Sequence, residues 1–418
     1  MLPIDWKRMR QLLPHLILPA LLICYFTLPI AIETFNRPAD INQNECLAGS
    51  ENDPDLIPRP NSGEVRIIRL TNAGEFVRRC DYTDVLYELV WDRLPAEVSP
   101  PKKPGAKSLP RFTVMYVHGW KHNAEEDDSD LGNFRTLIRK LADANPGRQV
   151  LGIYVAWNAR WGLGVLDNLS FWSKKHIADR IAQSAAVTKL VGAIGATRRT
   201  TNEVADQFIA IGHSFGARLL FSGTGQIFIY ETQKFHPGYP GGEYKVISGP
   251  ADAVILLNPA FEASLFTAFH SITRAQEQFS SNQAPLVVSI ATDADDATRY
   301  AFPVGQWIYG MIDSRERTTL GNYEPYFTHT LARTAGSGCT TSSDVGASEQ
   351  FQAAGLCLRR HAFSSAALMH PHNPFLVART DRTVMGGHND IWQPSFSDWL
   401  FRFVDSLRVK HEQSDKAK

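Results

Sequence analysis

The sequence predicts an α/β fold, in which a mostly parallel β-sheet carries helices on both faces and one transmembrane helix precedes it. Short runs rich in β-branched and aromatic residues alternate with stretches at helical spacing, an order typical of a parallel sheet. These runs are apolar throughout, as strands buried on both faces require. A charge-free apolar segment near the N-terminus predicts the membrane helix.

The composition excludes two classes of protein. The 418 residues include 43 Lys and Arg against 43 Asp and Glu, so the chain lacks the basic charge of a nucleic-acid-binding protein. Aromatic residues make up 11%, which argues against a disordered chain. Charged residues make up only 21%, below the ~25% typical of soluble domains, so part of the chain avoids water. We expect a folded protein with no nucleic-acid partner.

The apolar segment lies between Arg10 and Glu33, and its 22 residues carry no formal charge. As a helix it would extend roughly 33 Å, enough to cross a bilayer. Three basic residues precede it, which are Lys7, Arg8 and Arg10. We therefore expect a cytosolic N-terminus over 1–10, an anchor over 11–34, and the remainder on the extracytoplasmic (periplasmic or lumenal) side. A cleaved signal peptide, which would release a secreted protein, is the alternative; its apolar region usually has only ~7–15 residues.

The cysteines fit an oxidising compartment. Cys24 falls within the apolar segment and leaves four outside it, an even number. We expect the local pairs Cys46–Cys80 and Cys339–Cys357, one of three possible connectivities. Four free thiols are the alternative.

The domain begins after a tether. Residues 35–63 are rich in Pro, Asn, Asp and Glu without periodicity, so we expect a tether there, one domain over 64–408 and a polar tail over 409–418. Turn residues bound each apolar run, and the predicted strands are Glu64–Leu70, Phe112–Val117, Val150–Trp157, Phe208–Gly212, Ala253–Asn258, Leu286–Ala291 and Phe375–Arg379. Helical spacing predicts helices over Asp81–Leu94, Asn133–Ala144, Lys175–Val191, Ala217–Thr232 and Ser397–Val409.

Two further segments differ from this alternation. Residues 298–373 form a predicted insertion, rich in Tyr, Phe and Gly. Its aromatic side chains, together with the stretch Trp157–Trp172, are candidates to line an apolar pocket, with ordinary core packing as the alternative. The acidic run Glu125–Asp130 is interpreted as a solvated face and helix entry.

The sequence Gly-His-Ser-Phe-Gly at 212–216 is a G-x-S-x-G motif. It follows a predicted strand and opens a predicted helix, which is the context of a nucleophile elbow. Such a turn brings the residues two before and two after the serine close to other backbone, so Gly212 and Gly216 leave the space. Ser214 is the candidate nucleophile. A plain turn between strand and helix is the alternative.

A serine nucleophile needs a base, an acid and donors for the oxyanion. His118-Gly119-Trp120 follows the strand Phe112–Val117, so the backbone N–H groups of Trp120 and Phe215 are the expected oxyanion donors. His118 itself is expected only to support this loop.

The base and the acid should lie at neighbouring strand ends. His388 lies in the loop between the last strand and the last helix, which makes it the best base among the later histidines. The run Thr292–Thr298 follows the strand Leu286–Ala291 and holds three candidate acids, Asp293, Asp295 and Asp296. Glu262 is a poorer candidate.

Five motifs resemble serine hydrolases of the α/β-hydrolase superfamily with a short oxyanion loop of the HGW type. They are YVHGWKHNA (116–124), GHSFG (212–216), LLNPAFE (256–262), DADDATRYAFP (293–303) and GGHND (386–390). In similar uncharacterised bacterial and fungal hydrolases an aspartate stands two residues before an Ala-Thr pair. The resemblance therefore implies an α/β-hydrolase fold and the triad Ser214, Asp295 and His388, with Asp293 as the alternative acid. The chain departs from common members in the insertion 298–373.

These features predict a membrane-anchored serine hydrolase, esterase-like or lipase-like, acting on a small or lipid-like ester through an acyl-enzyme. We expect no cofactor and no metal, and the oligomeric state is not predicted. An acyltransferase with the same triad is one alternative. A catalytically silent, membrane-tethered binding protein on the same fold is the other.

Overall fold

The structure is a computed structural model. It describes residues 62–90, 109–160, 170–201, 204–234, 246–275, 279–308, 313–335, 339, 350–361 and 371–416. The predicted N-terminus 1–10, the anchor 11–34 and nearly all of the tether lie outside these ranges. Among the described helices, none combines the length and the apolar character needed to cross a bilayer.

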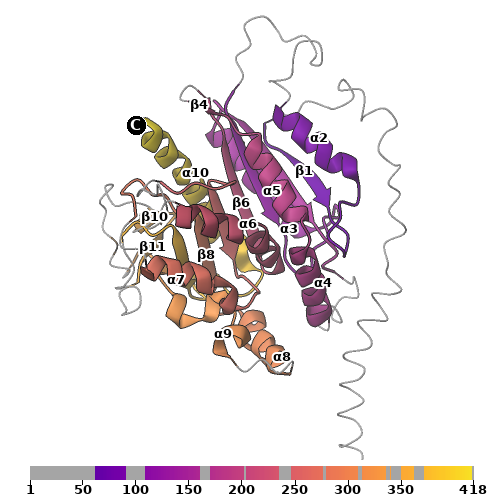
Figure 1. The fold of residues 1–418 in the computed structure, drawn as a ribbon, viewed down its shortest axis with the longest axis vertical. Helices are drawn as coiled ribbons and strands as arrows, with labels where there is room; N and C mark the ends of the chain where they lie inside the picture. Colours follow the sequence, from indigo (N-terminus) through magenta and orange to yellow (C-terminus); the bar gives the residue numbers. More distant parts are fainter. Residues whose placement is uncertain are drawn as a thin grey trace, which may run out of the picture.

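The described strands form one main sheet of ten strands, parallel over most of its width (Figure 1). In spatial order they are β1 (Glu64–Arg69), β3 (Gln149–Ala156), β2 (Arg111–Val117), β6 (Gln207–His213), β7 (Ala253–Leu257), β8 (Val287–Thr292), β12 (Phe375–Thr380), β9 (His329–Arg333), β11 (Leu356–Arg360) and β10 (Gln350–Ala353). Pairing is parallel from β1 to β9 and antiparallel from β9 through β11 to β10. A separate two-stranded ribbon joins β4 (Thr200–Thr201) to β5 (Val204–Ala205).

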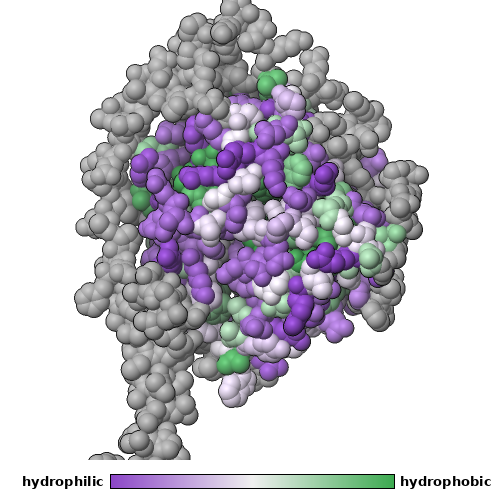
Figure 2. Space-filling view, turned by 180° about the vertical axis from the view of Figure 1, so that it is seen from behind, coloured by the Kyte–Doolittle hydropathy of each residue, from purple (hydrophilic) through white to green (hydrophobic). Residues whose placement is uncertain are grey.

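Helices cover both faces of the sheet, as the sequence predicts. One face carries α3 (Ser129–Ala144) and α10 (Pro394–Lys416), and the predicted tail 409–418 begins within α10. The other face carries α2 (Arg79–Val90), α4 (Phe171–Gln183), α5 (Ala186–Ala196), α6 (Phe215–Lys234) and α7 (Thr267–Ala275). On the surface shown in Figure 2, polar side chains predominate and apolar ones are scattered.

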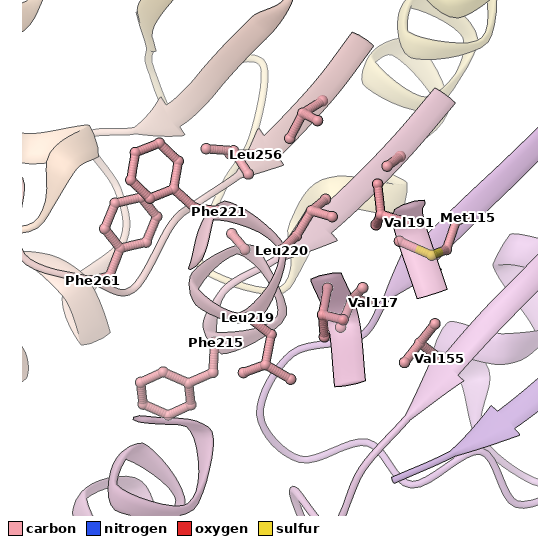
Figure 3. Close-up of a cluster of buried hydrophobic side chains, with 14 of the residues drawn as sticks. Met115, Val117, Val155, Val191, Phe215, Leu219, Leu220, Phe221, Leu256 and Phe261 are labelled. Atoms are coloured by element: carbon pink, nitrogen blue, oxygen red, sulfur yellow. The ribbon is translucent and has the colours of Figure 1, made fainter. Parts of the chain in front are cut away.

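Alternate residues of each central strand enter two different hydrophobic layers. In β2, Met115 and Val117 pack beneath α6, whereas Val114 and Tyr116 pack beneath α3. Figure 3 shows Leu219 and Leu220 of α6 beside these strands. Burying each such side chain contributes about 1.5–3 kcal/mol. The continuous apolar strands in the sequence therefore reflect burial on both faces.

The predicted helix Lys175–Val191 was wrong as one element, because the structure has two helices there. α4 ends at Gln183 and α5 begins at Ala186. Between them Ser184 has an extended backbone, and its hydroxyl donates to the Ile181 carbonyl and accepts from the Ala186 N–H. A serine that bonds its own backbone in this way ends one helix and starts the next.

The predicted insertion 298–373 contributes to the main sheet. Its strands β9, β11 and β10 extend the sheet beyond β12. The segment also carries a π-turn (Ala297–Ala301), α8 (Phe302–Ile308), α9 (Ser314–Arg317) and two 3-10 turns (Leu320–Asn322 and Glu324–Tyr326). Sequence reasoning missed these strands because they lack the continuous apolar character of the central ones.

A disulfide joins Cys339 to Cys357 of β11, as expected from the sequence. Cys80, on α2, is also disulfide-bonded, and its expected partner Cys46 lies outside the described residues.

The chain changes direction across the sheet between β2 and β6. From β2 it moves outward to β3, and from β3 it crosses back to β6 on the other side of β2. In parallel sheets the crevice at such a switch point, beyond the carboxyl ends of the strands, is where ligands bind. The loops after β2 and β6 are those that carry the HGW and GHSFG sequences.

Candidate active site

Ser214 occupies a strained turn between β6 and α6. Its φ is +57°, a left-handed conformation that is uncommon for serine, and its side chain is fully buried. The glycines on either side are required by close backbone approach. A Cβ on Gly216 would lie 2.1 Å from the Val117 carbonyl oxygen, and one on Gly212 would lie 2.7 Å from the Ala217 Cα. The geometry is that of a nucleophile elbow.

Three side chains from separate loops form a continuous hydrogen-bonded row. The His388 Nε2 lies 2.7 Å from the Ser214 Oγ, and the His388 Nδ1 lies 2.6 Å from the Asp295 Oδ2. With the proton on Nδ1 donating to Asp295, Nε2 is free to accept the serine proton. This is the relation of nucleophile, base and orienting acid in a serine hydrolase.

Asp295 is fully buried yet its environment favours the charged form. Burial alone would raise the pKa of this carboxyl. The charge and hydrogen bond of His388, together with the Thr298 N–H at 3.0 Å from Oδ1, outweigh burial and lower the pKa. An ionised carboxylate holds the imidazole tautomer and stabilises the imidazolium when it forms.

The backbone of His388 is held by two buried donors that the sequence analysis did not identify. The Asn258 Nδ2 and the His213 Nε2 each lie 2.9 Å from the His388 carbonyl oxygen. Asn258 lies just after β7 with a φ of +42°, and its Oδ1 accepts from the Thr292 N–H at 3.0 Å. One asparagine thus connects the end of β8 with the loop of the base. In the sequence, the one indication of this role is that Asn258 directly follows a predicted strand and lies within the LLNPAFE motif (256–262).

Two further contacts fix the loop of the base. The Thr292 hydroxyl donates to the Met385 carbonyl at 2.7 Å. On the other side of His388, the Trp392 Nε1 donates to Asp130 at 2.6 Å. The Tyr116 and Tyr154 hydroxyls donate to the same carboxylate, at 3.0 Å and 2.9 Å. The loop is therefore tied to β2, β3 and β8.

The expected oxyanion donors flank the elbow. Phe215 is the first residue of α6, so its N–H lies at the positive end of a helix dipole. Trp120 follows Gly119, where a Cβ would lie 2.8 Å from the Ser214 Cβ. Among the described residues, neither the Trp120 nor the Phe215 N–H has a hydrogen-bond acceptor. Both N–H groups remain available beside Ser214.

His118 supports this loop, in agreement with the role expected for it. Its Nδ1 lies 2.8 Å from the Gly119 carbonyl oxygen, and its Nε2 accepts from the Trp157 N–H at 3.0 Å. Burial, together with the neighbouring His122, lowers the pKa of His118 to about 3, so the ring is neutral.

The interpretation of the acidic run 125–130 as a solvated face was wrong for two residues. Asp128 and Asp130 are buried. Asp128 is the N-cap of α3, and its carboxylate accepts from the Asn123 and Ala124 N–H groups at 2.8 Å and 3.1 Å and contacts the His122 ring. The run does begin a helix. The buried Asp128 carboxylate bonds residues 122–124 of the loop after β2, and the buried Asp130 carboxylate accepts from Tyr116, Tyr154 and Trp392.

The other acid candidates lie differently. The Asp293 N–H donates to the Thr380 carbonyl, and its own carbonyl accepts from Arg299, so this residue links β8 to neighbouring segments by its backbone. Glu262 pairs with Lys175 at 2.8 Å and accepts from Gln306 at 2.6 Å. His388 contacts neither carboxylate within the described structure.

The aromatic segments separate into buried and exposed groups. The rings of Trp157 and Phe171 lie 6.4 Å and 5.0 Å from the ring of Phe215, beside the elbow. Tyr326 is buried in the core, whereas Trp307 is exposed. That these segments line an apolar pocket stays a prediction.

Comparisons with known proteins add one remote likeness. The chain matches no family model and no curated protein. It is similar to the solved structure of phospholipase PlaB from Legionella pneumophila in complex with thio-NAD, at 12% identity and a TM-score of 0.25. The match covers 73% of this chain and 62% of that chain, so this chain spans less than two thirds of the length of PlaB.

Among the described residues, no three His, Cys, Asp or Glu side chains lie close enough together to hold a metal ion. The chemistry that these residues offer is that of the Ser214, His388 and Asp295 row. Such a row activates a hydroxyl for attack on a carbonyl carbon.

Proposed function

We propose that the chain is a serine hydrolase that cleaves carboxylic esters through an acyl-enzyme on Ser214. The observation that carries the proposal is the continuous row from the Ser214 Oγ through His388 to Asp295, with distances of 2.7 Å and 2.6 Å. The first distance lies within the range at which a base takes a proton from a nucleophile, and the second is that of a hydrogen bond from the base to its orienting acid.

The first half of the reaction acylates the serine. The Ser214 Oγ attacks the ester carbonyl carbon while its proton passes to the His388 Nε2. The carbonyl oxygen takes the negative charge and accepts from the N–H groups of Trp120 and Phe215. Collapse of this intermediate breaks the bond to the alkoxide, which leaves as an alcohol after taking the proton from His388. Asp295 stabilises the imidazolium between these two transfers.

The second half releases the acid. Water attacks the acyl carbon as its proton passes to the His388 Nε2, and the same two N–H groups bind the oxyanion again. The Ser214 Oγ then leaves and regains the proton.

We place the domain on the extracytoplasmic side of a membrane, anchored by 11–34. The support is the uncharged apolar run of 22 residues with basic residues before it. A protein held beside a bilayer meets lipid-like esters at high local concentration, so these are the proposed substrate class.

Ester hydrolysis by the full chain in vesicles tests the proposal. Ser214→Ala should lower kcat by at least about 10³-fold on a chromogenic ester, as removal of a triad nucleophile does in other hydrolases. The matched control is Ser289→Ala, which removes a buried hydroxyl that has no hydrogen-bond partner in the described structure. This control should retain activity.

Absence of ester hydrolysis by the wild-type chain across short and long acyl chains would contradict the proposal and favour the silent binding protein. Equal activity of wild type and Ser214→Ala would contradict the assignment of the nucleophile.

A further inference from the structure

A stripe of exposed apolar side chains lies on the helical segment that follows the candidate acid. Tyr300, Val304 and Trp307 are 57%, 60% and 68% exposed, which places them among the most exposed large apolar residues of the described chain. Their spacing of four and three residues puts them on one face of a helix. We call these three residues the α8 stripe. Contiguous apolar groups on a soluble surface mark an interaction site.

The α8 stripe points outward because the opposite face of the same helical segment packs against the protein. Thr298, Phe302 and Gln306 are buried there. The Thr298 N–H donates to the Asp295 carboxylate at 3.0 Å, and Gln306 donates to Glu262 at 2.6 Å. A Cβ on Gly305 would clash with the Trp172 ring, so the helix packs closely on α4. The stripe is therefore held rigidly relative to the catalytic acid.

We propose that the α8 stripe contacts the lipid of a bilayer. Trp and Tyr combine an apolar ring with a polar group and gather at membrane interfaces, and Val304 supplies an aliphatic contact between them. The Arg299 guanidinium lies 5.4 Å from the centre of the Tyr300 ring, at the end of the stripe nearest the acid. An aromatic stripe with a cation at its edge suits the boundary between acyl chains and headgroups.

The chain itself supplies the reason to choose lipid as the occupant. Outside the described residues it carries the uncharged apolar run of 22 residues, followed by the sequence 35–63 that leads to β1. β1 starts at the amino-terminal edge of the sheet, whereas α8 follows the carboxyl end of β8. The connecting sequence must therefore span the height of the sheet. An eight-residue strand of the sheet rises about 26 Å. The segment 35–63 reaches about 95 Å when fully extended, so it is long enough for this span.

The contact has a consequence for the proposed function, on which this last step rests. The segment that touches lipid also bonds the triad acid, so the catalytic centre lies directly above the bilayer surface. An ester could then enter from the membrane without crossing water. The direct test of the lipid contact does not depend on catalysis.

The test uses the full chain carrying Ser214→Ala, reconstituted in phosphatidylcholine vesicles. The photoreactive residue p-benzoylphenylalanine replaces Val304 in one variant and Tyr230 in the other. Tyr230 is the matched control, because it is 55% exposed and lies on α6 about 22 Å from the start of that helix, toward the amino-terminal edge of the sheet. Illumination and mass spectrometry then identify what each position contacts.

The proposal predicts phospholipid adducts at 304 and none at 230. Adducts of equal yield at both positions, no adduct at 304, or a protein–protein crosslink at 304 would each overturn it, the last in favour of a second copy of the chain.

A second measurement tests the effect of the α8 stripe on ester hydrolysis. The double variant Val304→Asn and Trp307→Gln should keep its activity on a soluble short-chain ester and lose activity on an ester embedded in vesicles. If the wild type cleaves neither ester, the proposed function fails while the adducts still decide the lipid contact.

Discussion

The two halves of the candidate active site are built in different ways. Ser214 and the proposed oxyanion donors come from tight turns directly after β6 and β2, where close backbone contacts fix the geometry. Asp295 and His388 are 93 residues apart in the chain, and long-range hydrogen bonds from Asn258 and His213 hold the base in place. The nucleophile half therefore depends on close backbone packing between two neighbouring turns, and the acid–base half depends on side-chain hydrogen bonds between distant segments. Substitutions in the two halves should therefore impair the protein in different ways, through stability in the first and through activity in the second.

In the acid–base half, the largest effect on activity should come from Asp295→Asn. This change keeps the shape but removes the charge that holds the His388 tautomer, so kcat should fall by about 10³–10⁴-fold with the fold intact. The comparison variant is Asp293→Asn, which should stay within a few-fold of wild type. Steady-state kinetics with circular dichroism checks both. A larger loss from Asp293→Asn would exchange the roles of the two aspartates.

Gly216→Ala should disrupt the nucleophile half by destabilising the fold. Its Cβ would lie 2.1 Å and 2.5 Å from two carbonyl oxygens of the backbone, which cannot move aside as a side chain can. The free energy of unfolding should fall by at least about 3 kcal/mol. Gly132→Ala is the control, since its Cβ meets nothing within 4 Å in α3, and should raise stability by about 0.5–1 kcal/mol. Urea denaturation measures both, and equal stabilities would refute the argument from close contact.

Asn258→Ala should affect the acid–base half alone. Loss of its amide leaves the His388 carbonyl with one donor, so the imidazole shifts from its position and kcat should fall by about 10–100-fold, with KM nearly unchanged. Turnover and thermal unfolding should be measured together. A wild-type kcat in the folded variant would show that His213 and Thr292 suffice to hold the loop.

The last prediction is a slope of the free energy of unfolding against pH. The pKa of His118 is lowered by burial to about 3, whereas the unfolded chain takes up the proton near pH 6.5. Between these values the unfolded state binds more protons, so its free energy relative to the native state falls as the pH falls. Each pH unit should cost about 1.4 kcal/mol of stability from this residue. Urea unfolding from pH 6 to pH 4 should show a shallower slope for His118→Gln. An unchanged slope would mean that the buried ring is already charged.

The same contrast explains what could be predicted from the sequence. The strands β2, β3, β6, β7, β8 and β12 carry continuous apolar runs because both of their faces are buried, and these were found within a residue or two. The elbow was predicted because close backbone approach requires a glycine at both positions, Gly212 against Ala217 and Gly216 against the Val117 carbonyl. By comparison, the strands β9 to β11 have partly exposed residues and a mixed pattern, and they were missed.

The contacts that assemble the site were beyond sequence reasoning for a physical reason. Asn258 and His388 are 130 residues apart, and neither residue type alone indicates that an amide will bond a distant carbonyl. The choice between Asp293 and Asp295 came from resemblance to other hydrolases, because two acids separated by one residue give the same local pattern. Only the tertiary structure distinguishes the carboxylate that contacts the imidazole.

The central claim is that Ser214 is the activated nucleophile, and one measurement tests it most directly. The full chain in vesicles is treated with a fluorophosphonate probe, which phosphonylates only an activated serine, and the modified peptide is identified by mass spectrometry. The account predicts a single adduct on Ser214, formed in the wild type and absent in Ser214→Ala. An adduct on another serine, or no adduct in the folded wild-type chain, would contradict it.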